Sequence, residues 1–337
     1  MYGLAMAQAT YRGMIKRSPG KRPFVLSRST FLTSSVWTFH WFGDNYSAWD
    51  DYRLSMSQML GFSAVHNMPM VGTDVCGFNG KAQELMCARW AMLASFMPFM
   101  RNHADISAPV QEFYEWELVA EAARKALGAR YRLLDYLYTT LHLSSTEGSP
   151  SVYPLFFLYP SDENTYGIDY QFFLGKSVLV SPVFEDDSQS VTFYLPNDVF
   201  YDFWTLEKVR GNGEPVTRDD VAWTDIPVHI RGGSVLPLRS QSANTTTALR
   251  ENNFDLIVAS GLDGKAHGVL YLDDGESIDG DESLIKFDWD GSKLHASGSF
   301  GYKSGLEVER VIVLGDGGNS TFEGGWSLDG PFEVTIE

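Results

Sequence analysis

The residues best suited to chemistry lie in one stretch, HWFGDNYSAWDDY, which spans residues 40–52. Asp44 stands among aromatic residues on both sides, directly after a glycine that frees the backbone. Desolvation by aromatic neighbours favours the protonated form of a carboxyl group, and sugar rings stack on aromatic faces. We therefore expect Asp44 to act as a general acid at a carbohydrate site. The residues alone favour this interpretation no more than an acidic surface loop beside an aromatic core.

Short apolar runs that end in polar side chains would position further groups, because buried parallel strands deliver functional residues at their carboxyl ends. Three such runs cover residues 23–28, 69–74 and 98–103 and end at Arg28, Asp74 and His103, and a fourth covers residues 152–158. Helices are expected at residues 4–16, 47–61, 84–96 and 112–143, with a short one at 170–174. About four strand–loop–helix units predict the C-terminal half of a (β/α)8 barrel. Its open sheet edges make it unlikely to stand alone.

The pattern changes near residue 178 to short strands separated by turn residues. The expected fold class is therefore α/β plus all-β, with the half barrel at residues 1–177. A proximal antiparallel β domain follows at 178–240 and a distal β-sandwich at 241–337, after a polar, linker-like segment. The acidic run LYLDDGES lacks the full ligand pattern of a calcium loop, so we interpret it as a strand and turn and assign no metal.

Composition narrows the functional classes and the partners. The chain has 337 residues and a formal net charge of −17, without a basic patch, which excludes nucleic acid as the expected partner. No apolar run approaches membrane-spanning length, and the first residues do not resemble a signal peptide. Cys76 and Cys87 could form a local disulfide or remain buried thiols. Sequons at Asn244 and Asn319 would be usable in a secreted protein.

Five blocks of sequence, taken in order, resemble the family 31 glycoside hydrolases, the α-glucosidase family. They are RPFVLSRSTF (22–31), HWFGDNYSAWDDYRLSMSQML (40–60), MPMVGTDVCGF (68–78), ELMCARWAMLASFMPFMRNH (84–103) and DYQFFLGKSVLVSPV (169–183). The resemblance covers residues 1–240 well and the last module loosely. The cysteine-containing blocks are closer to the secreted or lysosomal branch, particularly the fungal type, which implies a secreted, extracellular, lysosomal or vacuolar location.

The resemblance assigns roles residue by residue. Asp44 matches the general acid/base, Arg28 and His103 match groups that hydrogen-bond the sugar in the −1 subsite, and Trp41 and Phe78 match aromatic residues that line it. Arginine offers a rigid fork of donors to neighbouring hydroxyls. No cofactor is implied.

The same resemblance implies that Cys76 and Cys87 pair as a disulfide, which would hold the segment beside the pocket. Taken alone, Arg28 would more often be a buried ion-pair partner, and Asp74 is the candidate. An isolated histidine such as His103 would more often be satisfied by a backbone carbonyl.

One departure from the family pattern concerns the nucleophile. Retaining glycosidases need two carboxylates, and the family's W-x-D-M-N-E-like nucleophile motif is absent from this chain. We therefore expect an N-terminal chain of the same enzyme to supply the nucleophile, giving a heterodimeric α-glucosidase that acts on malto-oligosaccharides. The alternatives are an α-xylosidase of the same family and a non-catalytic carbohydrate-binding subunit.

Overall fold

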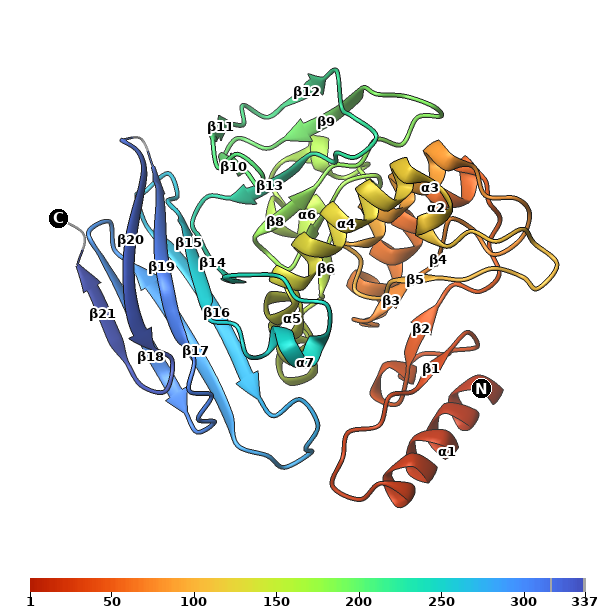
Figure 1. The fold of residues 1–337 in the computed structure, drawn as a ribbon, viewed down its shortest axis with the longest axis horizontal. Helices are drawn as coiled ribbons and strands as arrows, with labels where there is room; N and C mark the ends of the chain where they lie inside the picture. The colour runs from red at the N-terminus through yellow and green to blue at the C-terminus, as the bar shows by residue number, and fades with distance from the viewer. Residues whose placement is uncertain (316, 336–337) are drawn as a thin grey trace.

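The chain folds into three parts that follow one another along the sequence (Figure 1). A computed structural model describes residues 1–315 and 317–335. Helices and short parallel strands form the N-terminal part, short antiparallel strands form the middle, and a large sheet forms the C-terminal part.

The N-terminal part contains parallel strands of two or three residues. Strands β1 (Leu26–Ser27), β2 (Phe39–Trp41) and β3 (Val71–Gly72) pair in that order, and β4 (Asp74–Val75) pairs with β5 (Arg101–Asn102). The runs predicted to be strands at 23–28, 69–74 and 98–103 are confirmed. Strand β2 was missed, because its residues were assigned to the loop that carries Asp44.

The helices of this part are α1 (Tyr2–Arg17), α2 (Trp49–Leu60), α3 (Glu84–Ala94), α4 (Glu117–Arg132) and α5 (Leu134–Glu147). All four predicted long helical regions are confirmed, although residues 112–143 form two helices rather than one. Helix α4 buries Val119, Ala122, Ala126 and Ala129, whose spacing places them on one face. Its alanines favour the helix intrinsically and allow close packing on α3.

Two local predictions are wrong. Residues 152–158 do not form a fourth parallel strand: β6 covers only Val152–Tyr153, pairs antiparallel with β7, and is followed after Pro154 by the one-turn helix α6 (Leu155–Leu158). Residues 170–174 are not helical, because β7 occupies Phe172–Leu174 and is buried between β6 and β8 (Val178–Val180). A short apolar run fits either a helix or a strand, so the strands available to pair with it decide which of the two forms.

The middle part is antiparallel, as predicted. Its sheet has the order β11-β10-β13-β8-β7-β6, and β9 (Val191–Leu195) pairs separately with β12 (Glu214–Arg218). The other new strands are β8 (Val178–Val180), β10 (Val199–Asp202), β11 (Lys208–Arg210) and β13 (Val228–Arg231). Because β6 and β7 precede residue 177 and pair with this sheet, the sheet continues across the predicted domain limit.

The C-terminal part is one continuous sheet in the order β20-β19-β15-β14-β16-β17-β18-β21, on the left of Figure 1. Its strands are β14 (Ser234–Arg239), β15 (Phe254–Ala259), β16 (Ala266–Asp273), β17 (Glu282–Trp289), β18 (Lys293–Phe300), β19 (Glu307–Gly315), β20 (Gly318–Ser327) and β21 (Phe332–Thr335). Strand β17 alternates buried Ile285, Phe287 and Trp289 with more exposed residues, which builds a separate core. The segment predicted to be a linker contains the short helix α7 (Thr246–Leu249).

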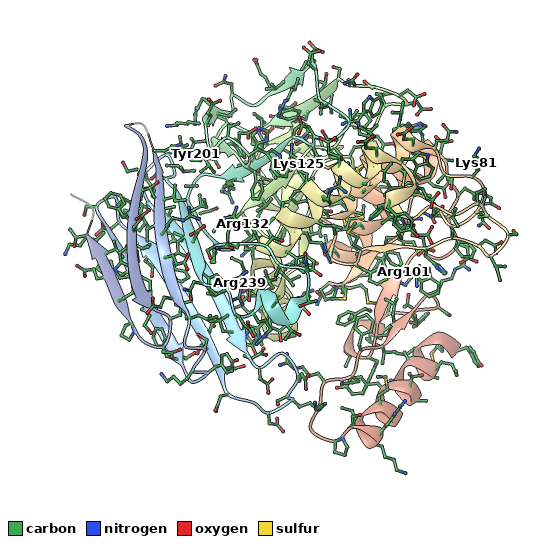
Figure 2. The ribbon with its side chains drawn as sticks, viewed as in Figure 1. Lys81, Arg101, Lys125, Arg132, Tyr201 and Arg239 are labelled. Atoms are coloured by element: carbon green, nitrogen blue, oxygen red, sulfur yellow. A yellow bond between two sulfur atoms is a disulfide. The ribbon has the colours of Figure 1, made fainter. Side chains whose placement is uncertain are left out.

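A buried ion pair joins this sheet to the helices. The guanidinium of Arg239 on β14 donates to both carboxylate oxygens of Asp135 on α5, at 2.6 and 2.8 Å, and lies over the Phe254 ring. Arg239 lies between the sheet and the helical part in Figure 2. Its side chain is 2% exposed. Such a pair fixes the two elements in one relative position, because separating them would leave a buried charge unpaired.

A second connection reaches the N-terminal part. The backbone N–H of Arg22 donates to the Glu276 carbonyl at 2.8 Å, and its Nη1 donates to the Tyr138 hydroxyl at 2.6 Å. Its Nη2 also pairs with the buried carboxylate of Asp273, to which the Tyr138 hydroxyl donates. The LYLDDGES segment is therefore the end of β16 and a turn, as predicted. Asp274 accepts hydrogen bonds from the turn's own backbone.

Candidate active site

Each predicted site residue lies at or just beyond the carboxyl end of a parallel strand. Arg28 follows β1, Trp41 ends β2, Phe78 lies three residues after β4, and His103 follows β5. Asp44 lies in the loop between β2 and α2. Carboxyl ends of parallel strands meet at one edge of a sheet, so these short strands gather the residues at one rim.

Asp44 is exposed, so the aromatic enclosure expected from the sequence is not present around its carboxyl group. The preceding Gly43 has φ = +86°, and a Cβ there would lie 2.3 Å from Nε of Arg28. Glycine is therefore required at this position both for its backbone conformation and for the space that Arg28 occupies. The guanidinium of Arg28 packs directly on the backbone that presents Asp44.

Asn45 fixes the Asp44 loop to the neighbouring strand end. Its Nδ2 donates to Oγ1 of Thr73 at 2.8 Å and to the carbonyl of Asp74 at 2.9 Å. Its Oδ1 and its backbone carbonyl both accept the N–H of Phe78, at 3.0 and 3.1 Å. Since both the nitrogen and the oxygen of the Asn45 amide are hydrogen-bonded, the Asp44 loop is held rigidly.

Asp74 is the acidic residue whose role sequence reasoning did not identify. It is fully buried, and its Oδ1 accepts two hydrogen bonds from Arg101, at 3.1 Å from Nε and 2.5 Å from Nη2. The ion pair considered between Asp74 and Arg28 is therefore wrong, because Arg101 occupies that position. Arg101 also lies over the Trp41 ring, 5.4 Å from its centroid.

The electrostatics of Asp74 connect the site residues. Burial raises the pKa of Asp74, the Arg101 guanidinium and His103 lower it, and Asp44 raises it. Both Asp44 and His103 are therefore close enough to act on this carboxyl. Within the described residues, Oδ2 of Asp74 and Nε1 of Trp41 are buried without a hydrogen-bond partner. Unpaired buried polar atoms are uncommon in native structures and call for an explanation such as a functional site.

Phe78 and His103 form a ring pair at the same rim. Their centroids are 5.1 Å apart and their planes are inclined by 40°. His103 is exposed and Phe78 is half-buried. This arrangement leaves the imidazole accessible to a ligand while the phenyl ring supports it.

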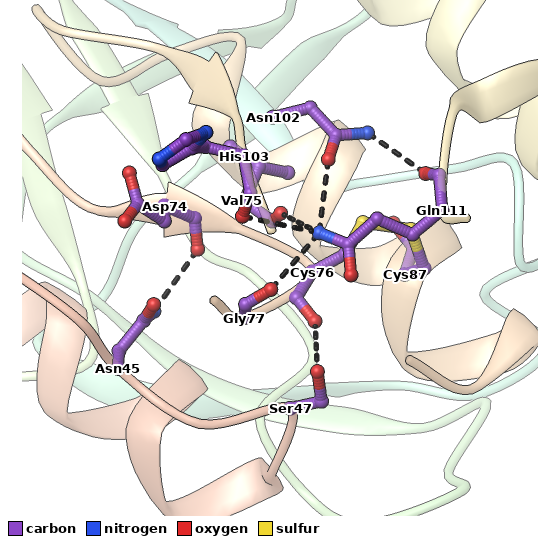
Figure 3. The surroundings of a disulfide bond; sticks show 10 residues. All are labelled: Asn45, Ser47, Asp74, Val75, Cys76, Gly77, Cys87, Asn102, His103 and Gln111. Atoms are coloured by element: carbon purple, nitrogen blue, oxygen red, sulfur yellow. Dashed lines mark hydrogen bonds between the residues drawn. A yellow bond between two sulfur atoms is a disulfide. The ribbon is translucent and has the colours of Figure 1, made fainter. Parts of the chain in front are cut away.

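The disulfide between Cys76 and Cys87 is present, and Cys76 lies two residues before Phe78 (Figure 3). It joins the segment after β4 to α3, with 4.7 Å between the two Cα atoms. Cys76 has φ = +68°, a left-handed conformation that is uncommon for residues other than glycine. The carbonyl of Cys76 accepts a hydrogen bond from Oγ of Ser47, 2.8 Å away, which ties the disulfide segment to the Asp44 loop.

The two sequons differ in their surroundings. Asn244 is exposed in the segment before α7. Asn319 is exposed on β20, and its Nδ2 donates to the Leu206 carbonyl at 3.2 Å. Glycosylation at either position stays a prediction.

A cavity of about 630 Å³ lies apart from the site residues, against the segment that precedes β7 and against β9. Its walls include Tyr170 and Phe184. The buried Gln171 there donates from Nε2 to Oγ of Ser181 and the carbonyl of Tyr194, both at 3.0 Å, and accepts the Tyr194 N–H. The polar atoms of the Gln171 side chain are thus already paired, unlike Oδ2 of Asp74 and Nε1 of Trp41.

Two searches over residues 1–315 and 317–335 gave negative results. No group of three or more His, Cys, Asp and Glu side chains in this part of the chain could hold a metal ion. Every helix in the same ranges is too short or too polar to span a bilayer.

Parallel strands that carry an exposed carboxylate, an imidazole and aromatic rings at their carboxyl ends have the arrangement of the functional rim of a (β/α) barrel. The sequence matches the description "Glycosyl hydrolases family 31 TIM-barrel domain" over residues 1–140 and "Glycosyl hydrolase family 31 C-terminal domain" over residues 148–236. The chain belongs to glycosyl hydrolase family 31, as the resemblance predicted.

Curated relatives are fungal and plant proteins. The probable alpha/beta-glucosidase agdC of Aspergillus fumigatus is 48% identical over 316 residues, which are 94% of this chain and 36% of the relative. The corresponding protein of Aspergillus oryzae is 46% identical over all of this chain and 40% of its own length. A probable alpha-glucosidase of Oryza sativa subsp. japonica is 47% identical over 280 residues, 82% of this chain and 31% of its own. The chain thus spans well under half the length of these relatives.

Solved structures agree with this assignment. The glucosidase II alpha subunit bound to alpha3-Glc2 has a TM-score of 0.92 and 28% identity, over 99% of this chain and 42% of that one. A family 31 alpha-xylosidase from Xanthomonas citri has a TM-score of 0.84 at 21% identity, over 100% of this chain and 39% of that one. At 21% identity, the similarity to the alpha-xylosidase concerns the fold alone.

Proposed function

We propose that this chain is the acid/base-bearing part of a retaining, exo-acting α-glucosidase. The enzyme would remove terminal, non-reducing, α-linked glucose from malto-oligosaccharides and transfer it to water or to another sugar. One observation carries the proposal: Asp44 is exposed on a loop that Asn45 locks to the strand ends carrying Asp74 and Phe78. Family membership and the named α-glucosidase relatives support the substrate class.

Asp44 would act in both halves of the reaction. In the first, its carboxyl donates a proton to the glycosidic oxygen while the C1–O bond breaks and C1 bonds to the nucleophile. In the second, the Asp44 carboxylate takes a proton from water or a sugar hydroxyl, whose oxygen then attacks C1 and releases the nucleophile. Exposure of Asp44 suits this role, since both the leaving sugar and the incoming acceptor must reach it.

The remaining predicted residues would bind the glucose ring in the −1 subsite. Arg28 offers guanidinium donors to neighbouring hydroxyls, and no hydrogen bond from its side chain to another described residue competes with them. His103 would donate to a further hydroxyl. Trp41 and Phe78 would supply the apolar wall.

The nucleophile would come from polypeptide outside these 337 residues, in our proposal a separate N-terminal chain of the same enzyme. The absence of the family's nucleophile motif from these 337 residues supports a source of the nucleophile outside them. We further propose secretion or lysosomal delivery of the assembled enzyme. Native mass of the isolated protein tests the assembly: a species well above 37.7 kDa that separates under denaturing conditions into two chains is expected. A single-chain species with full activity would contradict it.

The decisive experiment is Asp44→Asn in the assembled enzyme. Turnover of maltose should fall by about 10³-fold or more, because protonation of the leaving oxygen contributes roughly 10²–10⁴-fold. Aryl α-glucosides with good leaving groups need no such proton, so the variant should still form the glycosyl-enzyme intermediate in a burst. Asp50→Asn is the matched control, since Asp50 is an exposed carboxylate six residues away that pairs with Arg53. Near-normal maltose turnover by Asp44→Asn would refute the assignment, and aryl α-xyloside measured alongside tests the sugar preference.

A further inference from the structure

Gln111 occupies an unusual position behind the Phe78–His103 pair. It lies in the loop between β5 and the 3-10 turn at Phe113–Glu115 and is 4% exposed. The two N–H groups of its Nε2 are shared among four acceptors: the carbonyls of Gly77 at 2.9 Å and of Val75 and His103, both at 3.3 Å, and Oδ1 of Asn102 at 3.0 Å. Figure 3 shows these contacts converging on one amide. One side chain therefore holds the backbone after both β4 and β5.

The shortness of the two strands explains why such an amide is needed. Val75 and Asn102 are register partners at the end of a ladder only two residues long, so the carbonyls beyond them have no ladder partner. Buried carbonyls without a partner cost free energy, and Gln111 binds two of these, those of Gly77 and His103. Asn102 completes the link by donating from Nδ2 to the Gln111 carbonyl at 2.9 Å.

The bonded backbone is that of the site itself. Gly77 directly precedes Phe78, and His103 is held through its own carbonyl. On the opposite side, the disulfide restrains the left-handed Cys76. A segment with a strained residue persists only when its surroundings restrain it, so the amide and the disulfide act together. Oε1 of Gln111 is buried without a partner among the described residues, a cost that an apolar side chain would avoid.

We propose that Gln111 is a positioning residue for the glucose pocket. Its amide fixes the loops after β4 and β5 so that the Phe78 and His103 rings stay in contact and present one wall of the −1 subsite. The role of that wall rests on the proposed function, whereas the placement of the two rings does not. Gln111 does not touch the sugar and acts only through the two loops.

Gln171 provides a matched control. It is also 4% exposed and also bridges backbone and hydroxyl groups with its amide, but in the middle part of the fold. Leucine and glutamate substitutions at both positions remove comparable hydrogen bonds. If a loss of activity came only from destabilisation, the Gln111 and Gln171 variants should therefore lose activity equally.

The first readout is the ring contact, measured in the assembled enzyme by NMR with ¹³C-labelled histidine and assigned with His103→Gln. Gln111→Leu should shift the His103 imidazole signal as it leaves the Phe78 ring current, and Gln171→Leu should not. An unchanged His103 signal in Gln111→Leu, or an equal shift in Gln171→Leu, would overturn the proposal. This readout needs no activity: if the unmodified enzyme hydrolyses no α-glucoside, the proposed function fails while the placement of the rings is still decided.

The second readout is kinetic. A displacement of the wall by about 1 Å should lower kcat/KM for maltose by roughly 10²-fold in Gln111→Leu, mainly through KM, because the wall contacts bound sugar. Gln111→Glu should lose kcat/KM as the pH rises, since only a protonated carboxyl can donate to the carbonyls. The same substitution at Gln171 should leave the pH profile of kcat/KM unchanged, and identical profiles for the two glutamate variants would count against the proposal.

Discussion

Replacing Arg101 by methionine should destabilise the protein in a pH-dependent way, because it removes the partner of the buried Asp74. Two donors of Arg101, Nε and Nη2, converge on one oxygen of Asp74, whose side chain is fully buried. Methionine preserves much of the volume against the Trp41 ring but offers no donor. The substitution therefore tests the charge pair more than the packing.

The size of the effect follows from the burial of the pair. Removing one partner of a fully buried ion pair costs about 3–5 kcal/mol. Since the Arg101 side chain is 35% exposed, solvent screening reduces this to about 2–3 kcal/mol at neutral pH. The same loss should raise the pKa of Asp74 further, because the Arg101 guanidinium is the group that lowers it most.

The direction of the pH dependence is set by the raised pKa of Asp74 in the folded state. A raised carboxyl pKa means that the native state binds the proton more tightly than the unfolded state. The contribution of Asp74 to stability is therefore present below its ordinary pKa of 3.8 and is lost as the pH rises through its pKa in the folded state. Without Arg101 the pKa of Asp74 in the folded state is higher still. The deficit of Arg101→Met should thus be small near pH 4 and grow towards pH 7.

Urea unfolding followed by tryptophan fluorescence at several pH values measures this deficit. Asp74→Asn in the Arg101→Met background should restore most of the lost stability, since no buried charge remains. Arg53→Met is the control: its partners Asp50 and Asp186 are exposed, so the cost should be about 1 kcal/mol or less and independent of pH. Equal destabilisation by Arg101→Met at pH 4 and pH 7, or no recovery in the double variant, would refute the reasoning.

Three further predictions follow from single contacts. Gly43→Ala should lower kcat/KM for maltose by about tenfold or more, because the new Cβ would displace Arg28 and φ = +86° disfavours alanine. Arg239→Leu should lower the free energy of unfolding by about 3–5 kcal/mol in urea, since it leaves Asp135 buried and unpaired. Burial lowers the pKa of His40 from 6.5 to about 4, so stability should fall by about 2–3 kcal/mol as pH drops through that window, and His40→Phe should remove this dependence in urea titrations.

Control substitutions separate these effects from general damage. Gly13→Ala lies on α1 with open space around its position and should not change activity. Arg210→Leu removes an exposed arginine that bonds Asn197 and should cost less than about 1 kcal/mol. Activity unchanged in Gly43→Ala, a loss in Arg239→Leu as small as in Arg210→Leu, or an acid-dependent loss that persists in His40→Phe would each contradict the corresponding argument.

The sequence predicted the residues that end strands better than it predicted their partners. Apolar runs ending in a polar residue located Asp74 and His103 correctly, because buried parallel strands impose that pattern. Composition could not show that Asp74 pairs with Arg101 rather than Arg28, because that choice depends on which strands become neighbours. Gln111 gave no signal at all, since three of its four acceptors are backbone carbonyls, which look the same in every sequence.

The same limit explains the misassigned segments. The β7 run, at Phe172–Leu174, fits helix or strand until β6 and β8 lie on either side of it. The enclosure expected around Asp44 is absent for a related reason: Phe42 packs on His40 and Phe62, Trp49 packs on Tyr52, and Tyr46 is itself 60% exposed. Proximity in sequence is a weak guide to burial in a loop.

The attachment of Arg22 to the turn after Asp273 gives the C-terminal sheet a mechanical role at the pocket. Only five residues separate Arg22 from Arg28, and the backbone and side chain of Arg22 form hydrogen bonds with residues near the end of β16. The C-terminal sheet thus restrains the strand that carries Arg28 towards the pocket. The contact joins Arg22 to Asp273, which lie 251 positions apart in the chain. A protease cut within residues 274–277 would loosen that strand at its entry while leaving every residue of the pocket intact.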